Sequence, residues 1–225
     1  MSTDTLEPVM AGSEEGGKSL AVHGLEPSGD VFWNLAPVRL YEESFARGDG
    51  QLVHMGAISA VTAPHTGRSP NDRFVVRDEN TEEPVDWGKV NVPVSGEHYA
   101  TLRRDVVEFL NARDLFVQDC YAGADPDYRL KVRVVTESAW HNLFARNMFR
   151  QPTAEEMSSF TPELTILNAP YYKTHAERDG VNSDCAIMMN FRERMVLVAG
   201  TQYAGTRLVN SAYGRGRGYS RQCFS

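Results

Sequence analysis

Residues 130–149 read LKVRVVTESAWHNLFARNMF, and the spacing of the apolar residues changes in the middle of this stretch. In residues 130–134 apolar side chains alternate with Lys131 and Arg133, which predicts a half-buried strand with a polar outer face. From residue 139 onward the apolar residues recur at the spacing of an amphipathic helix. A strand followed directly by a helix indicates that the chain mixes the two element types.

The same two patterns continue on both sides of this stretch. Apolar residues at helical spacing after Ser95 and Gly96 predict a helix over 97–113, and Thr153 with Glu156 forms a capping-box pattern that opens a short helix. Further strands are expected at 115–117, 164–167, 185–191 and 195–199, and the polar link 192–194 makes the last two a hairpin. We therefore predict an α/β fold, a mixed β-sheet with flanking helices.

Composition excludes several classes of protein. The chain has 225 residues, 41% of them hydrophobic, which is enough for a core, and its net charge of −7 argues against a main role in nucleic-acid binding. The three cysteines, Cys120, Cys185 and Cys223, are too few and too far apart for a disulfide framework or a zinc site. Neither a secretory signal nor an apolar run of membrane-spanning length is evident, so we expect a cytoplasmic protein without membrane contact.

The chain divides into three zones. Residues 1–30 are acidic, rich in glycine and poor in large apolar residues, which predicts a disordered N-terminal tail. Residues 31–205 carry the α/β pattern. Residues 206–225 contain four arginines and no acid, and the run GRGRG at 214–218 leaves an RNA-binding segment as one interpretation of this Arg/Gly tail.

A polar loop is the first candidate binding element. Residues 66–73 read TGRSPNDR, between expected extended runs at 56–61 and 74–77. Glycine and proline favour a tight turn, and such a turn holds Arg68 away from the backbone. A guanidinium offers two parallel donors to a carboxylate or phosphate, which suits Arg68 to an anion clamp. An ordinary turn with a salt-bridged arginine is the alternative.

Tyr203 is the second candidate, because it lies just past the end of the expected strand 195–199, where side chains can face a cleft. A packed tyrosine with a satisfied hydroxyl is the alternative interpretation. The six histidines lack metal-binding spacing, and no serine lies in a nucleophile-elbow motif. Residues 12–19 match the pattern of a phosphate-binding loop, but they lack the preceding apolar strand that such a loop requires.

Six blocks of sequence, in order, resemble the amino-terminal domain of the ATP-dependent phosphoenolpyruvate carboxykinases. The resemblance begins with HTGRSPNDRFVV at 65–76 and covers about residues 35–205. The further blocks are GAD at 123–125, RL and VRVVTE at 129–137, AWH and LFARNMF at 139–149, TILNA with NS at 165–183, and GTQYAG at 200–205. The resemblance implies the fold of that domain for residues 31–205.

The resemblance also implies a reaction. This family converts oxaloacetate and ATP into phosphoenolpyruvate, carbon dioxide and ADP in gluconeogenesis, with a divalent metal, Mg or Mn. Arg68 matches the position that clamps the substrate carboxylate, and Tyr203 matches a position at the substrate site. Beyond Arg68 no catalytic residue is assigned, and we expect neither nucleotide-binding nor metal-binding residues in this chain.

The family pattern ends abruptly after Gly205, where Leu208 or Val209 stands in place of a catalytic lysine. We therefore prefer an incidental tail for 206–225, and we expect the chain alone to bind oxaloacetate or phosphoenolpyruvate at most and to be inactive. A non-catalytic dicarboxylate-binding or interaction module is the alternative function. Loss of the second domain would expose an apolar interdomain face, which predicts self-association.

Overall fold

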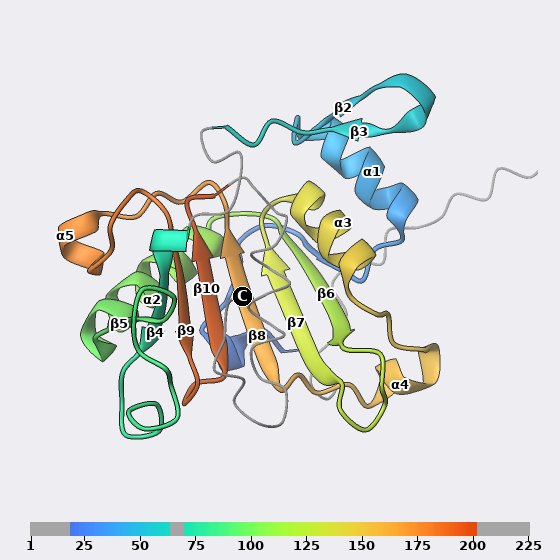
Figure 1. The fold of residues 1–225 in the computed structure, drawn as a ribbon. Helices are drawn as coiled ribbons and strands as arrows, with labels where there is room; N and C mark the ends of the chain where they lie inside the picture. The colour runs from blue at the N-terminus through green and yellow to red at the C-terminus, as the bar shows by residue number, and fades with distance from the viewer. Residues whose placement is uncertain (1–18, 64–69, 202–225) are drawn as a thin grey trace, which may run out of the picture.

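A single large β-sheet dominates the computed structural model, which describes residues 19–63 and 70–201 (Figure 1). Its eight strands lie in the order β1-β6-β7-β8-β10-β9-β4-β5. The strands are β1 (Val31–Trp33), β4 (Arg73–Val76), β5 (Val92–Val94), β6 (Leu115–Ala122), β7 (Leu130–Thr136), β8 (Leu164–Ala169), β9 (Ala186–Asn190) and β10 (Met195–Ala199).

Helices pack on both faces of this sheet. One face is covered by α2, and the other by α3, on which α1 packs. The α-helices are α1 (Pro37–Ala46), α2 (Gly96–Asn111), α3 (Ala139–Met148), α4 (Ala154–Ser158) and α5 (Ala176–Asp179). The short elements are η1 (Ala21–His23), η2 (His54–Gly56), η3 (Pro70–Asp72) and the two-stranded sheet of β2 (Gln51–Leu52) and β3 (Ile58–Ser59).

Helix α2 shows how the apolar pattern becomes packing. The Ser95 hydroxyl accepts a hydrogen bond from the His98 amide at 3.1 Å and caps the helix where the sequence predicts its start. The apolar stripe then lies buried against the sheet, with Leu102, Val106 and Leu110 inaccessible to solvent. The predicted α/β class with a mixed sheet is confirmed, because the sheet contains both parallel and antiparallel pairs.

Strand β7 differs from its prediction. The half-buried strand with Arg133 on an outer face is wrong, because helices cover both faces of the sheet and residues 132–136 are all buried. Arg133 is fully buried and makes two hydrogen bonds to Asp119, at 2.7 and 3.0 Å. Its guanidinium also lies over the Trp33 ring, 4.9 Å from the centroid. A buried ion pair thus takes the place of an exposed basic residue.

The C-terminal hairpin and the short capped helix agree with their predictions. Strands β9 and β10 pair antiparallel, and Arg194 turns the chain with φ at 53°. Thr153 and Glu156 form both hydrogen bonds of the capping box of α4. The extended run expected at 56–61 is mostly absent, since η2 ends at Gly56 and β3 covers only Ile58–Ser59.

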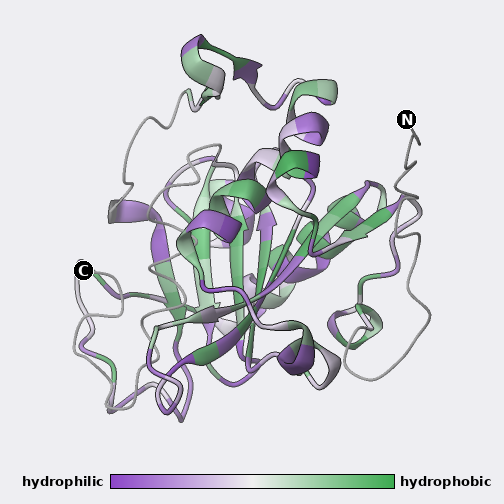
Figure 2. Ribbon diagram, turned by 90° about the vertical axis from the view of Figure 1, so that its right-hand side faces the viewer, coloured by the Kyte–Doolittle hydropathy of each residue, from purple (hydrophilic) through white to green (hydrophobic). Residues whose placement is uncertain are grey.

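The acidic tail predicted for residues 1–30 needs a correction over its last twelve residues. Leu20 and Leu25 are buried in the core beside α2, and η1 lies between them. Residues 1–18 and the Arg/Gly segment 206–225 lie outside the described residues. Figure 2 shows hydrophobic residues along the central strands and hydrophilic ones on many of the peripheral turns, as expected for a sheet buried on both faces.

Candidate functional site

The register of the sheet brings two segments distant in sequence to one edge. Parallel pairing sets Arg73 at the start of β4 opposite Ile187 in β9. Antiparallel pairing then sets Ala199, the last residue of β10, opposite Ala186 at the start of β9. The chain therefore enters β4 and leaves β10 at the same edge, with only β9 between them.

The two predicted site residues lie just beyond these chain ends. Arg68 precedes η3 by two residues, and Tyr203 follows Thr201 by two. Both fall in the segments 64–69 and 202–225, outside the part of the chain that the structure describes. Their assignment as substrate-binding residues remains a prediction.

The segment 182–185 braces the entry into β4. The Ser183 hydroxyl donates to Oδ1 of Asp72 at 2.8 Å and accepts from the Cys185 amide at 3.3 Å. The Asn182 side chain donates to the backbone carbonyl of Asn71 at 2.6 Å. Asp72 is buried, so its hydrogen bond to Ser183 matters for the turn that follows Arg68 in sequence. The sequence drew attention to residues 182–183 only as part of the resemblance.

The same segment supports the exit from β10. Gly200 has a φ of +73°, and a Cβ at this position would lie 2.0 Å from the backbone oxygen of Asp184. Only glycine fits here, because both the backbone angle and the contact exclude a side chain. The Gly200 amide also donates to the Ala169 carbonyl at 3.2 Å. Residues 182–185 therefore fix the flanks of both predicted site residues.

A cavity of about 750 Å³ opens beside this brace. The Arg178 guanidinium is already paired in this cavity, since it contacts Asp105 at 3.0 Å and Asp179 at 2.8 Å. The hydrogen bonds that it donates to Asp179 raise the pKa of Arg178. The lining residues are Thr174, His175, Ala176, Glu177, Arg178, Ser183 and Asp184. The cavity shares Ser183 and Asp184 with the brace.

Other chemistry is sparse among the described residues. Cys120 and Cys185 are buried and unbridged, and burial raises the pKa of the Cys120 thiol well above its usual value. His141 is buried on α3, with Nδ1 2.8 Å from Nδ2 of Asn168. Within residues 19–63 and 70–201 no three His, Cys, Asp or Glu side chains lie together as metal ligands.

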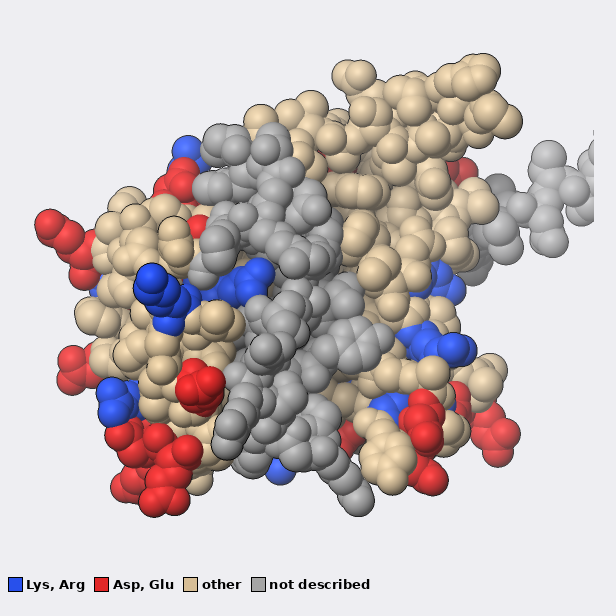
Figure 3. All heavy atoms as spheres, in the orientation of Figure 1, with Lys and Arg blue, Asp and Glu red and all other residues tan. Residues whose placement is uncertain are grey.

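The described surface has no large basic patch on the face shown in Figure 3. On the face shown in Figure 3, basic side chains stand singly or in small groups among acidic ones. Across the described ranges, no helix combines the length and the apolar character needed to cross a bilayer.

Comparisons with known proteins agree with the resemblance. The sequence pattern of the phosphoenolpyruvate carboxykinase family matches residues 29–207. The phosphoenolpyruvate carboxykinase (ATP) of Thermus thermophilus is 48% identical over 186 residues, which are 81% of this chain and 35% of that protein. The enzyme of the same name from Brucella suis is 46% identical over 187 residues, 83% of this chain and 35% of the relative.

A third relative with this name, from Geobacter sp. strain M21, is 40% identical over 189 residues, 84% of this chain and 36% of its own length. The chain thus spans about a third of the curated relatives that it matches, as the 35% coverage shows. By the extent of the family match over residues 29–207, this chain belongs to the ATP-dependent phosphoenolpyruvate carboxykinase family.

Proposed function

We propose that this chain supplies the substrate-binding, N-terminal part of an enzyme that converts oxaloacetate and ATP into phosphoenolpyruvate, carbon dioxide and ADP. The printed name of the relatives, phosphoenolpyruvate carboxykinase (ATP), supports the reaction. The observation that carries the proposal is the register of β4, β9 and β10, because it brings the flanks of Arg68 and Tyr203 to one edge of the sheet.

In this proposal Arg68 is the anion clamp. Its guanidinium would hold a carboxylate of oxaloacetate or phosphoenolpyruvate through two parallel hydrogen bonds, and its charge would offset the enolate that decarboxylation leaves. Tyr203 would shape the pocket around the substrate and the departing carbon dioxide. The segment 182–185 contacts Asp72 and Gly200, and it would hold the chain before β4 and the chain after β10 at a fixed separation.

ATP and the divalent metal would bind to groups other than those described. Among the described residues, no cluster of His, Cys, Asp or Glu fits a metal ion. We expect the 225-residue chain on its own to be inactive, because the groups that bind the metal and ATP would not be in place. Each group that stabilises a transition state electrostatically is worth about 10² to 10³ in rate. For the whole enzyme we propose a carboxy-lyase of gluconeogenesis in the cytoplasm.

Calorimetry with oxalate, a stable dicarboxylate, tests the clamp without requiring turnover. We expect the chain to bind oxalate and the Arg68→Ala variant to bind it about 10- to 100-fold more weakly, because a charge-assisted pair is lost. Arg39→Ala is the matched control, since this arginine lies half exposed on α1 and should leave binding unchanged. Equal heats from the wild type and Arg68→Ala, or no heat from either, would overturn the assignment.

A further inference from the structure

A second cavity, with a mostly polar surface, lies at the same edge of the sheet but beside other strands. It has a volume of about 440 Å³ and is lined by residues that precede β1 and β6 and by residues that follow α1, β7 and β8. The residues that matter for its chemistry are Arg47, Asp49, Arg113, Glu137 and Tyr171. Because β4, β9 and β10 contribute nothing to its lining, the cavity is separate from the site described above.

Glu137 has a buried carboxylate oxygen with no partner. The side chain is 9% exposed, and Oε1 accepts a hydrogen bond from the Tyr171 amide at 3.1 Å. Oε2 is buried as well, yet none of the described groups donates to it or accepts from it. An isolated buried carboxyl oxygen is costly in either protonation state, so this atom indicates a missing hydrogen-bond partner.

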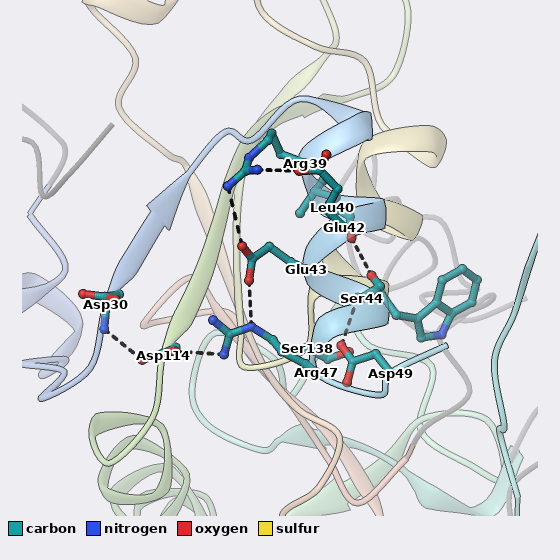
Figure 4. Close-up of polar contacts among 11 residues, drawn as sticks. Asp30, Arg39, Leu40, Glu42, Glu43, Ser44, Arg47, Asp49, Asp114 and Ser138 are labelled. Carbon is teal, nitrogen blue, oxygen red and sulfur yellow. Dashed lines mark hydrogen bonds and ion pairs between the residues drawn. The ribbon is translucent and has the colours of Figure 1, made fainter. Parts of the chain in front are cut away.

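The two arginines that line the cavity are engaged elsewhere. The Arg47 guanidinium contacts Glu43 at 3.0 Å and Asp114 at 2.8 Å, as the dashed lines in Figure 4 show. The Arg113 guanidinium lies 3.4 Å from the centroid of the Phe109 ring and donates to the Phe109 carbonyl at 2.7 Å. Neither cation forms an ion pair with Glu137.

Asp49 is a second acid without a cation. Its Oδ2 accepts from the Ser138 hydroxyl at 2.9 Å and from the Trp140 amide at 3.2 Å, and Oδ1 accepts from the Tyr171 hydroxyl at 2.8 Å. All these donors are neutral, and no described lysine or arginine pairs with this carboxylate. Figure 4 shows Asp49 in contact with Ser138 below the end of α1.

We propose that this cavity binds a small protonated amine, whose N–H groups donate to Oε2 of Glu137 and whose charge is balanced by Glu137 and Asp49. An ammonium group supplies both missing properties, a hydrogen-bond donor and a positive charge. An anion would instead face Asp49, Asp114 and Glu137 with both arginines already engaged.

The protonation of Glu137 gives this proposal a pH dependence. Burial raises the pKa of Glu137 to about 8, and the nearby Asp49 charge adds to this effect, whereas Arg113 opposes it. Arg47, Asp114 and Tyr171 are the other charged or titratable groups that line the cavity. A bound ammonium favours the ionised carboxylate, so binding should expel a proton, and affinity should rise about 20-fold from about pH 6.5 to about pH 8.5.

Isothermal calorimetry with ethylammonium chloride tests the proposal, with potassium chloride at equal ionic strength as the reference. Titrations at about pH 7 in two buffers of different ionisation enthalpy measure the protons released. We expect close to one proton per amine bound from the wild-type chain. Glu137→Gln should abolish this release and the rise in affinity with pH, whereas Glu177→Gln, in the other cavity, should preserve both.

The wild-type measurement decides even if Glu137→Gln fails to fold. No binding of ethylammonium beyond that of potassium, or binding without proton release, would overturn the proposal. An amine affinity that Glu137→Gln leaves unchanged would do the same. The assay contains no dicarboxylate and does not involve Arg68, so its outcome is independent of the oxalate test.

Discussion

The Ser183 hydroxyl donates to the Asp72 carboxylate at 2.8 Å and so ties the segment before β9 to the turn before β4. These two residues are 111 positions apart in sequence. Their contact means that η3, the turn directly before β4, is held by the segment that leads into β9. The hydrogen bond is therefore the first one to test by mutation.

Removing the Ser183 hydroxyl should destabilise the domain. Ser183→Ala leaves the buried Asp72 carboxylate without this donor, and we expect the free energy of unfolding to fall by about 1–3 kcal/mol. Urea denaturation followed by circular dichroism measures the change. Ser158→Ala, which removes an exposed hydroxyl bond on α4, should cost less than about 0.5 kcal/mol, and an equal loss in both variants would contradict the prediction.

A methyl group at position 200 should be tolerated badly. In Gly200→Ala the new Cβ would meet the Asp184 carbonyl, and the positive φ would add strain, so we expect a loss of at least about 2 kcal/mol. Gly96→Ala is the matched control, because a Cβ there has open space and enters the first turn of α2. Thermal unfolding should show the first variant destabilised and the second unchanged or slightly stabilised.

The stability of the domain should depend on both charges of the buried ion pair between Arg133 and Asp119. Asp119→Asn leaves the fully buried guanidinium without a counter-charge, and we expect a loss of about 3–5 kcal/mol. Glu82→Gln breaks the exposed pair with Arg77 and should cost much less stability, because solvent screens both charges. Chemical denaturation of both variants compares the two pairs, and a small effect of Asp119→Asn would show that the burial of Arg133 is not energetically coupled to its partner.

His23 should make the domain sensitive to acid. Its Nε2 lies 3.1 Å from the Thr165 hydroxyl, and burial, with Arg133 and Arg103 nearby, lowers its pKa to about 4. The folded state therefore binds fewer protons here than the unfolded chain. This contribution to stability is present above about pH 6.5 and is lost as the pH falls through about 4.

Urea titrations between about pH 4 and pH 7 measure this effect. The difference in the free energy of unfolding between the wild type and His23→Gln should shrink as the pH falls. The wild type loses stability when His23 takes up a proton, whereas glutamine takes up none. Parallel profiles for the wild type and His23→Gln would refute the linkage.

The β2–β3 hairpin is the place where we expect self-association of the chain. Leu52, Met55 and Val61 are 63%, 90% and 77% exposed, and the hairpin forms a sheet separate from the main one. Leu52→Ser combined with Met55→Asn should raise the concentration at which light scattering detects oligomers, and asparagine suits the positive φ of Met55. A monodisperse wild-type chain at high concentration would contradict this expectation.

Local patterns predict single elements well in this protein. The stripe of Leu102, Val106 and Leu110 fixes α2, and the capping box fixes the start of α4, because both depend on neighbours in sequence. The pattern fails at β6, which was expected to end at Val117 but continues through Gln118 and Asp119. Asp119 is buried as the ion-pair partner of Arg133 on the adjacent strand. Gln118 is buried with its side chain donating to Asn34 and Gln151. Pairings between residues so distant in sequence have no local signal.

The candidate site shows the same division. Sequence alone singles out Arg68 and Tyr203 by turn chemistry and resemblance, but not the brace that joins their flanks. Ser183 and Gly200 matter through contacts with Asp72 and Asp184 that only the sheet order creates. Glu137 appears in the sequence as one residue of a strand exit, and its unpartnered oxygen becomes evident only when the cavity is seen.

Among the described residues, strand β10 is the last strand in sequence, yet it lies inside the sheet, between β8 and β9. During synthesis on the ribosome, β1, β6, β7 and β8 can pair before β10 emerges. Strands β4, β5 and β9 cannot yet pair with them, because β10 is the strand between β8 and β9. Two partial sheets with open edges would then coexist until residue 199 is free of the exit tunnel. Nascent chains stalled before Met195 should consequently be prone to aggregate and to require chaperones.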